Sequence, residues 1–275
     1  MQVIGNMFNF RPATSGELLF QHVADQFISK EAIQQVYQWS YLQIGNRQDD
    51  LVEYYIGIFC FNLTARLIKK AKHLAEDFAV IESQRPNQMK AYVQTEMGIA
   101  IDSKNKHDIS KLISLSISAA LESGKSIAPS TKKLVTSGQG AICCYICGVG
   151  LQLAGDDEFT QIQYEHIWPS SFGGDSILEN LLPACGKCNN AKNSMLLWQD
   201  AYVHSFVLEP FPSVGAIKSI SRREKIALHR RKIFREACEK RRTLKDAALI
   251  VGSMDMDVLT QMYPHDAVDF FNCTV

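Results

Sequence analysis

Two Cys-x-x-Cys pairs constrain the fold of this chain more than any other feature. Cys144 and Cys147 form the first pair, and Cys185 and Cys188 form the second. Two such hooks from separate parts of a chain are the usual way in which four thiolates surround one tetrahedral Zn²⁺. We therefore expect a small module that closes around a structural zinc ion.

The residues between the two hooks carry a second pattern. Residues 161–169 alternate as a β-strand does and end at a proline, so they deliver Glu165 and His166 near a strand end. A loop with two glycines follows, and then Asn180. After the second hook, residues 189–198 are predicted to form a short helix.

Several motifs in this stretch occur in a familiar order. They are GluHisIle-x-Pro, GlyGly, GluAsnLeu-x-Pro and Cys-x-x-Cys-Asn-x-x-Lys. Together they resemble the HNH endonuclease family, and the resemblance covers about residues 141–200. It implies a ββα-metal fold with a flanking structural zinc.

The resemblance also implies a role for four side chains. His166 stands at the position of the general base, and Glu165 stands at a metal-ligand position where Asp is commoner. Asn180 is the middle residue, expected to hold the loop and orient His166. Asn189 replaces the more usual His as the second metal ligand. An amide oxygen is a harder ligand than imidazole, so this change favours Mg²⁺ or Mn²⁺ at the catalytic position.

These residue types suit phosphodiester cleavage on chemical grounds as well. The reaction needs a base for water and a cation that neutralises charge on the phosphoryl oxygens. A neutral His166 can supply the base. Glu165 and Asn189 can hold a hard, partly hydrated cation with positions left open for phosphate oxygens.

The rest of the chain is predicted to be helical, so the expected fold class is mainly α with a small α+β module. Residues 1–140 form a helical domain for a protein partner or for homodimerisation, and residues 201–275 form a helical extension. Apolar periodicity and the absence of breakers indicate N-terminal helices over residues 16–28, 30–43, 50–83, 87–100 and 107–122. The segment 124–140, rich in Gly, Ser, Thr and Lys, marks the domain boundary.

The charges are distributed unevenly. Residues 218–245 carry 12 Lys or Arg and 3 Asp or Glu, a net charge of plus nine, whereas residues 144–217 carry 2 and 8, a net of minus six. We predict that the basic helix 218–245 contacts a phosphate backbone, with a solvated amphipathic helix as the alternative. An acidic tail follows it. The candidate nucleic-acid-binding residues are Lys192, Arg222, Arg223, Arg230, Arg231 and Lys232.

Composition favours a cytoplasmic protein without a membrane segment. The longest apolar run, residues 54–63, is about half as long as the roughly 20 residues that a spanning helix needs. Cys60, Cys238 and Cys273 stand alone, as reduced thiols do.

The leading hypothesis is a metal-dependent HNH endonuclease that acts on nucleic acid, with double-stranded DNA as the expected substrate. An effector role in prokaryotic anti-phage defence or restriction is compatible with the architecture. The first alternative is a zinc module that binds nucleic acid or a protein without cutting, because a cysteine zinc site needs neither His166 nor Asn180. A second alternative is an adaptor whose helical N-terminal region carries the function.

Overall fold

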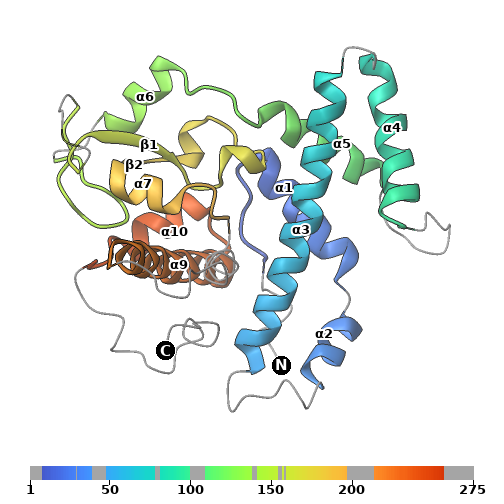
Figure 1. Ribbon diagram of the computed structural model, residues 1–275, viewed down its shortest axis with the longest axis horizontal. Coiled ribbons are helices and arrows are strands. Elements are labelled where there is room, and N and C mark those ends of the chain that lie inside the picture. Colours follow the sequence, from blue (N-terminus) through green and yellow to red (C-terminus); the bar gives the residue numbers. More distant parts are fainter. Residues whose placement is uncertain are drawn as a thin grey trace.

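The structure is a computed structural model that describes residues 8–28, 30–38, 48–77, 81–99, 109–137, 141–153, 157, 159–196 and 214–256. Within these residues the chain forms helices and a small two-stranded antiparallel sheet, so the predicted fold class is confirmed. Figure 1 shows the sheet next to α6, α7, α9 and α10, with the N-terminal helices to one side. The acidic tail beyond residue 256 lies outside the described residues.

The five predicted N-terminal helices are all present within the described residues, and the predicted positions 39–43, 100 and 107–108 lie outside them. They are α1 (Ser15–Phe27), α2 (Lys30–Tyr37), α3 (Gln48–Glu76), α4 (Arg85–Ala91), which is extended by the π-turn η4 (Tyr92–Glu96), and α5 (Ile109–Glu122). A 3₁₀ turn, η3 (Glu82–Gln84), precedes α4, so α3 ends earlier than the predicted residue 83. The long helix α3 packs against both α1 and α5 and forms the spine of this part (Figure 1).

The start of α1 is fixed by a reciprocal cap. The Thr14 hydroxyl accepts from the backbone N–H of Glu17, and the Glu17 carboxylate accepts from the N–H groups of Ala13 and Thr14. Such a box satisfies helix N–H groups that have no partner within the helix. It matters here because the next residues, Ser15 and Gly16, contact the loop beside His166.

The zinc-hook region folds as a β-hairpin followed by a helix. Strands β1 (Ile162–His166) and β2 (Leu181–Cys185) are antiparallel, with His166 opposite Leu181. The connection contains two 3₁₀ turns, η5 (Ser170–Phe172) and η6 (Leu178–Asn180). Helix α7 (Gly186–Lys192) follows at once. The prediction of a helix over 189–198 was wrong in its bounds, because Cys185 already caps the helix by accepting from Cys188 N–H.

A short helix also occurs within the predicted boundary segment 124–140. Helix α6 (Pro129–Thr136) has a proline at its first turn, where a missing N–H costs nothing. It packs against β2 and η6. The segment therefore lies against the hairpin.

Two helices close the described chain, α9 (Val214–Lys240) and α10 (Leu244–Val251). An apolar stripe of α9 is buried, as expected of an amphipathic helix, and its members are Ile226, Ile233, Phe234, Ala237 and Cys238. Figure 1 shows α9 lying across the module beside α7 and α10, and its residues Arg231 and Arg235 pair with Glu53 of α3.

Trp168, just after β1, joins the parts of the molecule. Its side chain is completely buried and packs edge-on against Phe20 of α1, with a 5.3 Å distance between ring centroids. Phe10 contacts both Trp168 and Phe234 of α9. The hydrophobic core is thus continuous from the N-terminal helices through the hairpin to α9. None of the described helices is long and apolar enough to cross a membrane.

Candidate nuclease site

The four hook cysteines lie together in space. Cys144 and Cys147 flank a tight turn before β1, whereas Cys185 ends β2 and Cys188 lies in the first turn of α7. All four sulfur atoms lie within 4.8 Å of one another, and those of Cys147 and Cys185 are 3.8 Å apart. A tetrahedral Zn²⁺ with bonds of about 2.3 Å would place its sulfurs about 3.8 Å apart, so the cluster fits zinc.

The hydrogen bonds among the four thiols act in opposite directions, because they lower the pKa of Cys144 and raise those of Cys185 and Cys188. Hydrogen bonds from the thiols of Cys147, Cys185 and Cys188 lower the pKa of the Cys144 thiol below its usual range. The Arg222 guanidinium lies 3.6 Å from the Cys188 sulfur. One Zn²⁺ and four thiolates would leave two negative charges, and Arg222 would offset part of them.

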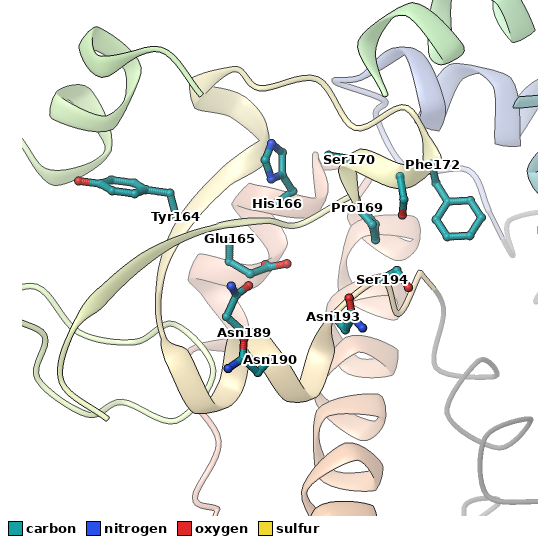
Figure 2. Close-up of a pocket in the computed structure, with 11 residues that line it drawn as sticks. Tyr164, Glu165, His166, Pro169, Ser170, Phe172, Asn189, Asn190, Asn193 and Ser194 are labelled. Carbon is teal, nitrogen blue, oxygen red and sulfur yellow. The ribbon is translucent and has the colours of Figure 1, made fainter. Parts of the chain in front are cut away.

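A cavity of about 810 Å³ opens beside the hairpin. Its walls come from the end of β1, from the loop after it and from the end of α7 (Figure 2). The lining residues are Tyr164, Glu165, His166, Pro169, Ser170, Ser171, Phe172, Asn189, Asn190, Asn193 and Ser194. The structure therefore brings the predicted His166, Glu165 and Asn189 to one cavity. It adds Asn190 and Asn193, which the sequence analysis did not single out.

His166 ends β1, and its ring is held by a hydroxyl group. The His166 Nε2 atom lies 3.0 Å from Ser176 Oγ, and the same oxygen lies 2.8 Å from the carbonyl of Lys125. Burial lowers the pKa of His166 below its ordinary value, with the Lys192 charge acting in the same direction and the Glu165 charge acting against it. A neutral imidazole is the form that can accept a proton.

Glu165 points from β1 toward Asn189 of α7, as Figure 2 shows. Its side chain is buried; one carboxylate oxygen accepts from the Tyr145 hydroxyl at 2.8 Å, and the other lies 2.5 Å from Lys192 Nζ. Burial, followed by the Glu165 charge, raises the pKa of Tyr145, so its hydroxyl stays protonated and donates. A carboxylate has about four lone-pair sites, and these two contacts leave some of them for a cation.

Asn189 offers the second oxygen. Its amide nitrogen donates to Gln163 Oε1 at 2.5 Å, which leaves the amide oxygen as the acceptor on the cavity side. Carboxylate and amide oxygens are the ligands that Mg²⁺ and Mn²⁺ prefer. The residues present therefore fit a hard divalent cation.

Asn180 lies outside the cavity wall and clasps the loop that follows β1. Its Oδ1 accepts from Trp168 N–H at 2.8 Å, and its Nδ2 donates to the carbonyls of Trp168 and Asp175, both at 3.0 Å. Gly174 allows this close packing, because a Cβ there would lie 1.9 Å from the Trp168 carbonyl oxygen. The clasp sets the position of the loop that carries Ser176 toward His166.

Half of the predicted phosphate-binding residues are buried. Lys192 is completely buried against Glu165, and its ammonium also donates to the carbonyl of His166. Arg230 is 2% exposed and donates to the carbonyls of Ile167 and Leu196, both at 3.0 Å. Arg231 is buried and lies 3.6 Å from a carboxylate oxygen of Glu53. For these three side chains, a role as a phosphate surface disagrees with their burial.

The other members of the predicted set differ in exposure. Arg222 and Arg223 are half-buried, and Lys232 is exposed. Much of the charge on α9 therefore compensates carbonyls, a carboxylate and the sulfur cluster within the protein. These contacts join residues far apart in the chain, so the charge count alone could not reveal them.

Two further exposed lysines lie on α6. The Lys132 ammonium lies 5.6 Å from the ring centroid of Tyr164, a residue of the cavity wall, and Lys133 is exposed beside it. A cation over an aromatic face is attracted to it. This contact holds one positive charge at the edge of the cavity.

A comparison with known protein families finds a match in the segment that holds the four cysteines and the cavity. Residues 144–197 match the HNH endonuclease family. No curated protein and no solved structure matches the chain. The match contains all four hook cysteines and all the residues that line the cavity.

Proposed function

Since residues 144–197 match the HNH endonuclease family, we propose that the protein is a metal-dependent endonuclease that hydrolyses phosphodiester bonds in double-stranded DNA. One observation carries the proposal: His166 and Glu165, adjacent on β1, line the same cavity as Asn189 of α7. A base, a carboxylate and an amide oxygen at one cavity are the groups that metal-assisted phosphodiester hydrolysis requires.

His166 is the proposed general base. With Nε2 directed at Ser176, the Nδ1 atom is the one that accepts a proton from water. The water oxygen then forms a bond to phosphorus while the bond to the leaving oxygen breaks. Burial keeps the imidazole neutral near pH 7, so it is ready to accept that proton.

Glu165 and Asn189 are the proposed ligands of the catalytic ion. When bound, Mg²⁺ or Mn²⁺ supplies the charge that neutralises the phosphoryl and leaving-group oxygens. The Lys192 ammonium forms an ion pair with the Glu165 carboxylate. This positive charge weakens the attraction of the carboxylate for a divalent metal ion. We therefore expect a millimolar rather than a micromolar requirement for Mg²⁺.

The nucleic acid surface is proposed to lie on α6 instead of α9. The exposed Lys132 lies over Tyr164 at the edge of the cavity, and the exposed Lys133 follows it on α6, so the helix presents two cations that can contact phosphates near the bond to be cut. Tyr164 offers an aromatic face at the same edge.

The N-terminal helices keep their proposed role as a contact for a protein partner or a second copy of the chain. An effector role in anti-phage defence or restriction is a hypothesis that rests on this architecture alone. Neither role is needed for the chemistry at the cavity.

Incubation of the purified chain with supercoiled plasmid and Mg²⁺ or Mn²⁺ tests the proposal. Wild type should nick or linearise the plasmid, and His166→Ala should cut about 10²- to 10⁴-fold more slowly while keeping its zinc and its DNA affinity. Single-stranded DNA and RNA of matched sequence test the choice of substrate. Undiminished cutting by His166→Ala would overturn the assignment, and DNA binding without any cutting by wild type would favour the non-catalytic zinc module.

Two variants of Asn189 separate the metal site from the base. Asn189→Ala removes a ligand, so high Mg²⁺ or Mn²⁺ should recover part of the lost rate. Asn189→His introduces an imidazole and should let softer ions such as Ni²⁺ support cutting. His166→Ala should show neither response to the ion.

A further inference from the structure

The hydroxyl group of Ser176 lies between two groups that determine its hydrogen-bonding role. Its oxygen is 2.8 Å from the carbonyl oxygen of Lys125 and 3.0 Å from Nε2 of His166. A carbonyl can only accept, so the single hydroxyl hydrogen points at Lys125. The Ser176 oxygen therefore accepts from His166, which places the ring proton on Nε2 and leaves Nδ1 with its lone pair.

The Lys125 carbonyl comes from outside the residues that match the family. It follows the end of α5, where Gly124 takes a positive φ of 81° and the Lys125 N–H donates to the carbonyl of Glu122 at 3.2 Å. The Lys125 ammonium also pairs with the Glu122 carboxylate at 2.6 Å. The carbonyl is thus anchored to the last turn of an N-terminal helix.

The loop that carries Ser176 is held by the N-terminal helices at further points. Gly16 N–H donates to the carbonyl of Gly173 at 2.8 Å, and the Ser15 hydroxyl donates to the Asp175 carboxylate at 3.3 Å. Gly173 also packs directly on Ala119 of α5, where a Cβ would lie 2.6 Å from the alanine methyl group. Both sides of the Ser176 contact are therefore built on the same helical part.

We propose that Ser176 is a positioning residue for His166, and that the Lys125 carbonyl acts through it to fix the Nε2–H tautomer. The inference rests on the proposed nuclease function for its catalytic meaning. It assigns a part of the active-site framework to residues 15–16, 119 and 125, which precede the zinc module. The N-terminal helices then support catalysis by holding Ser176 against His166, whatever else they bind.

The first test compares cleavage by Ser176→Ala, Ser176→Thr and the remote control Ser83→Ala, an exposed serine of η3. Ser176→Ala should lower kcat about 10- to 100-fold, as much as the loss of the hydrogen-bond partner that orients a metal-bound histidine. Its KM should stay within about twofold, because Ser176 does not line the cavity. Ser176→Thr keeps the hydroxyl and should restore most of the rate, and Ser83→Ala should match wild type.

The second test measures the tautomer of His166 directly, so it does not depend on nuclease activity. Two-bond ¹⁵N–¹H spectra distinguish the tautomers of the seven histidines, and His166→Ala identifies the signal of His166. Wild type should show Nε2–H at a pH where the ring is neutral, and Ser176→Ala should show a mixture. An Nδ1–H signal in wild type, or an unchanged tautomer together with an unchanged kcat in Ser176→Ala, would overturn the proposal. If the spectra show the expected tautomers but wild type does not cut plasmid, the hydrogen-bond arrangement is supported and the nuclease function is not.

Discussion

The ammonium of Lys192 lies 2.5 Å from a carboxylate oxygen of Glu165, and the two side chains are 0% and 3% exposed. Removal of one charge from such a pair leaves the other without compensation in the protein interior. Lys192 also donates to the carbonyl of His166 at 3.0 Å, so it braces the strand end at the proposed base. This pair links the stability of the module to the proposed cation site.

Lys192→Met should lower the free energy of unfolding by about 3–5 kcal/mol without added divalent cation, because Glu165 would be buried with one fewer positive neighbour. Saturating Mg²⁺ should reduce this loss, since a cation at Glu165 replaces the missing charge. Urea unfolding followed by circular dichroism measures both values.

The double variant Lys192→Met with Glu165→Gln removes both charges and should regain part of the stability. Lys133→Met on the exposed face of α6 serves as the control and should change stability little. Unfolding of Lys192→Met that matches wild type would refute a stabilising role for the pair.

Each chain should carry one zinc ion, held by the four hook cysteines. Cys188→Ser should lose the metal, and the module should then unfold locally, because zinc binding supplies much of the folding energy of so small a unit. Cys143→Ser is the matched control, since Cys143 is exposed and outside the four-sulfur cluster. Elemental analysis and near-ultraviolet circular dichroism provide the measurements. Zinc-free wild type that remains folded and active would contradict this prediction.

Local spacing in the sequence was enough to predict the zinc hooks and most helices. The first hook precedes β1, the second hook directly follows β2, and an alternating strand followed by a proline carries Glu165 and His166 to the cavity. Helix α6 was missed because its Ser, Thr and Lys composition resembles a linker. The start signal was nevertheless present, because Pro129 occupies the first turn.

The roles of the basic residues could not be predicted from the sequence. Arg230 binds carbonyls 34 and 63 positions away, and Arg231 pairs with Glu53 on a different helix. A count of charges cannot distinguish a cation that faces solvent from one that satisfies buried acceptors. Ser176 and Lys125, which are in contact, are likewise separated by 51 positions in the sequence, and no local pattern indicates this contact.

Glu17 should make stability depend on pH near neutrality. Burial raises its pKa to about 7 from an ordinary value of 4.5, and the Asp175 charge acts in the same direction. The folded state therefore holds a proton that the unfolded state releases, so the contribution is complete below about pH 4.5 and is lost as pH rises through 7. The total loss should be about 3 kcal/mol.

Glu17→Gln isolates this effect, because glutamine keeps the capping geometry and carries no charge. Between pH 5 and pH 8 the free energy of unfolding of wild type should fall relative to that of Glu17→Gln, so the variant becomes the more stable of the two relative to their difference at pH 5. Equal pH profiles for the two proteins would show that Glu17 titrates normally.

The salt dependence of DNA binding should distinguish the two candidate surfaces. Lys132→Ala with Lys133→Ala removes two exposed charges of α6, one of them at the cavity edge, so the slope of log affinity against log salt should become shallower by about 2. The matched control, Lys69→Ala with Lys90→Ala, removes two exposed lysines of α3 and α4 and should leave the slope unchanged. Fluorescence anisotropy with catalytically silent His166→Ala protein provides the affinities. If Lys232→Ala makes this slope shallower and the double variant of α6 does not, the phosphate-binding surface lies on α9.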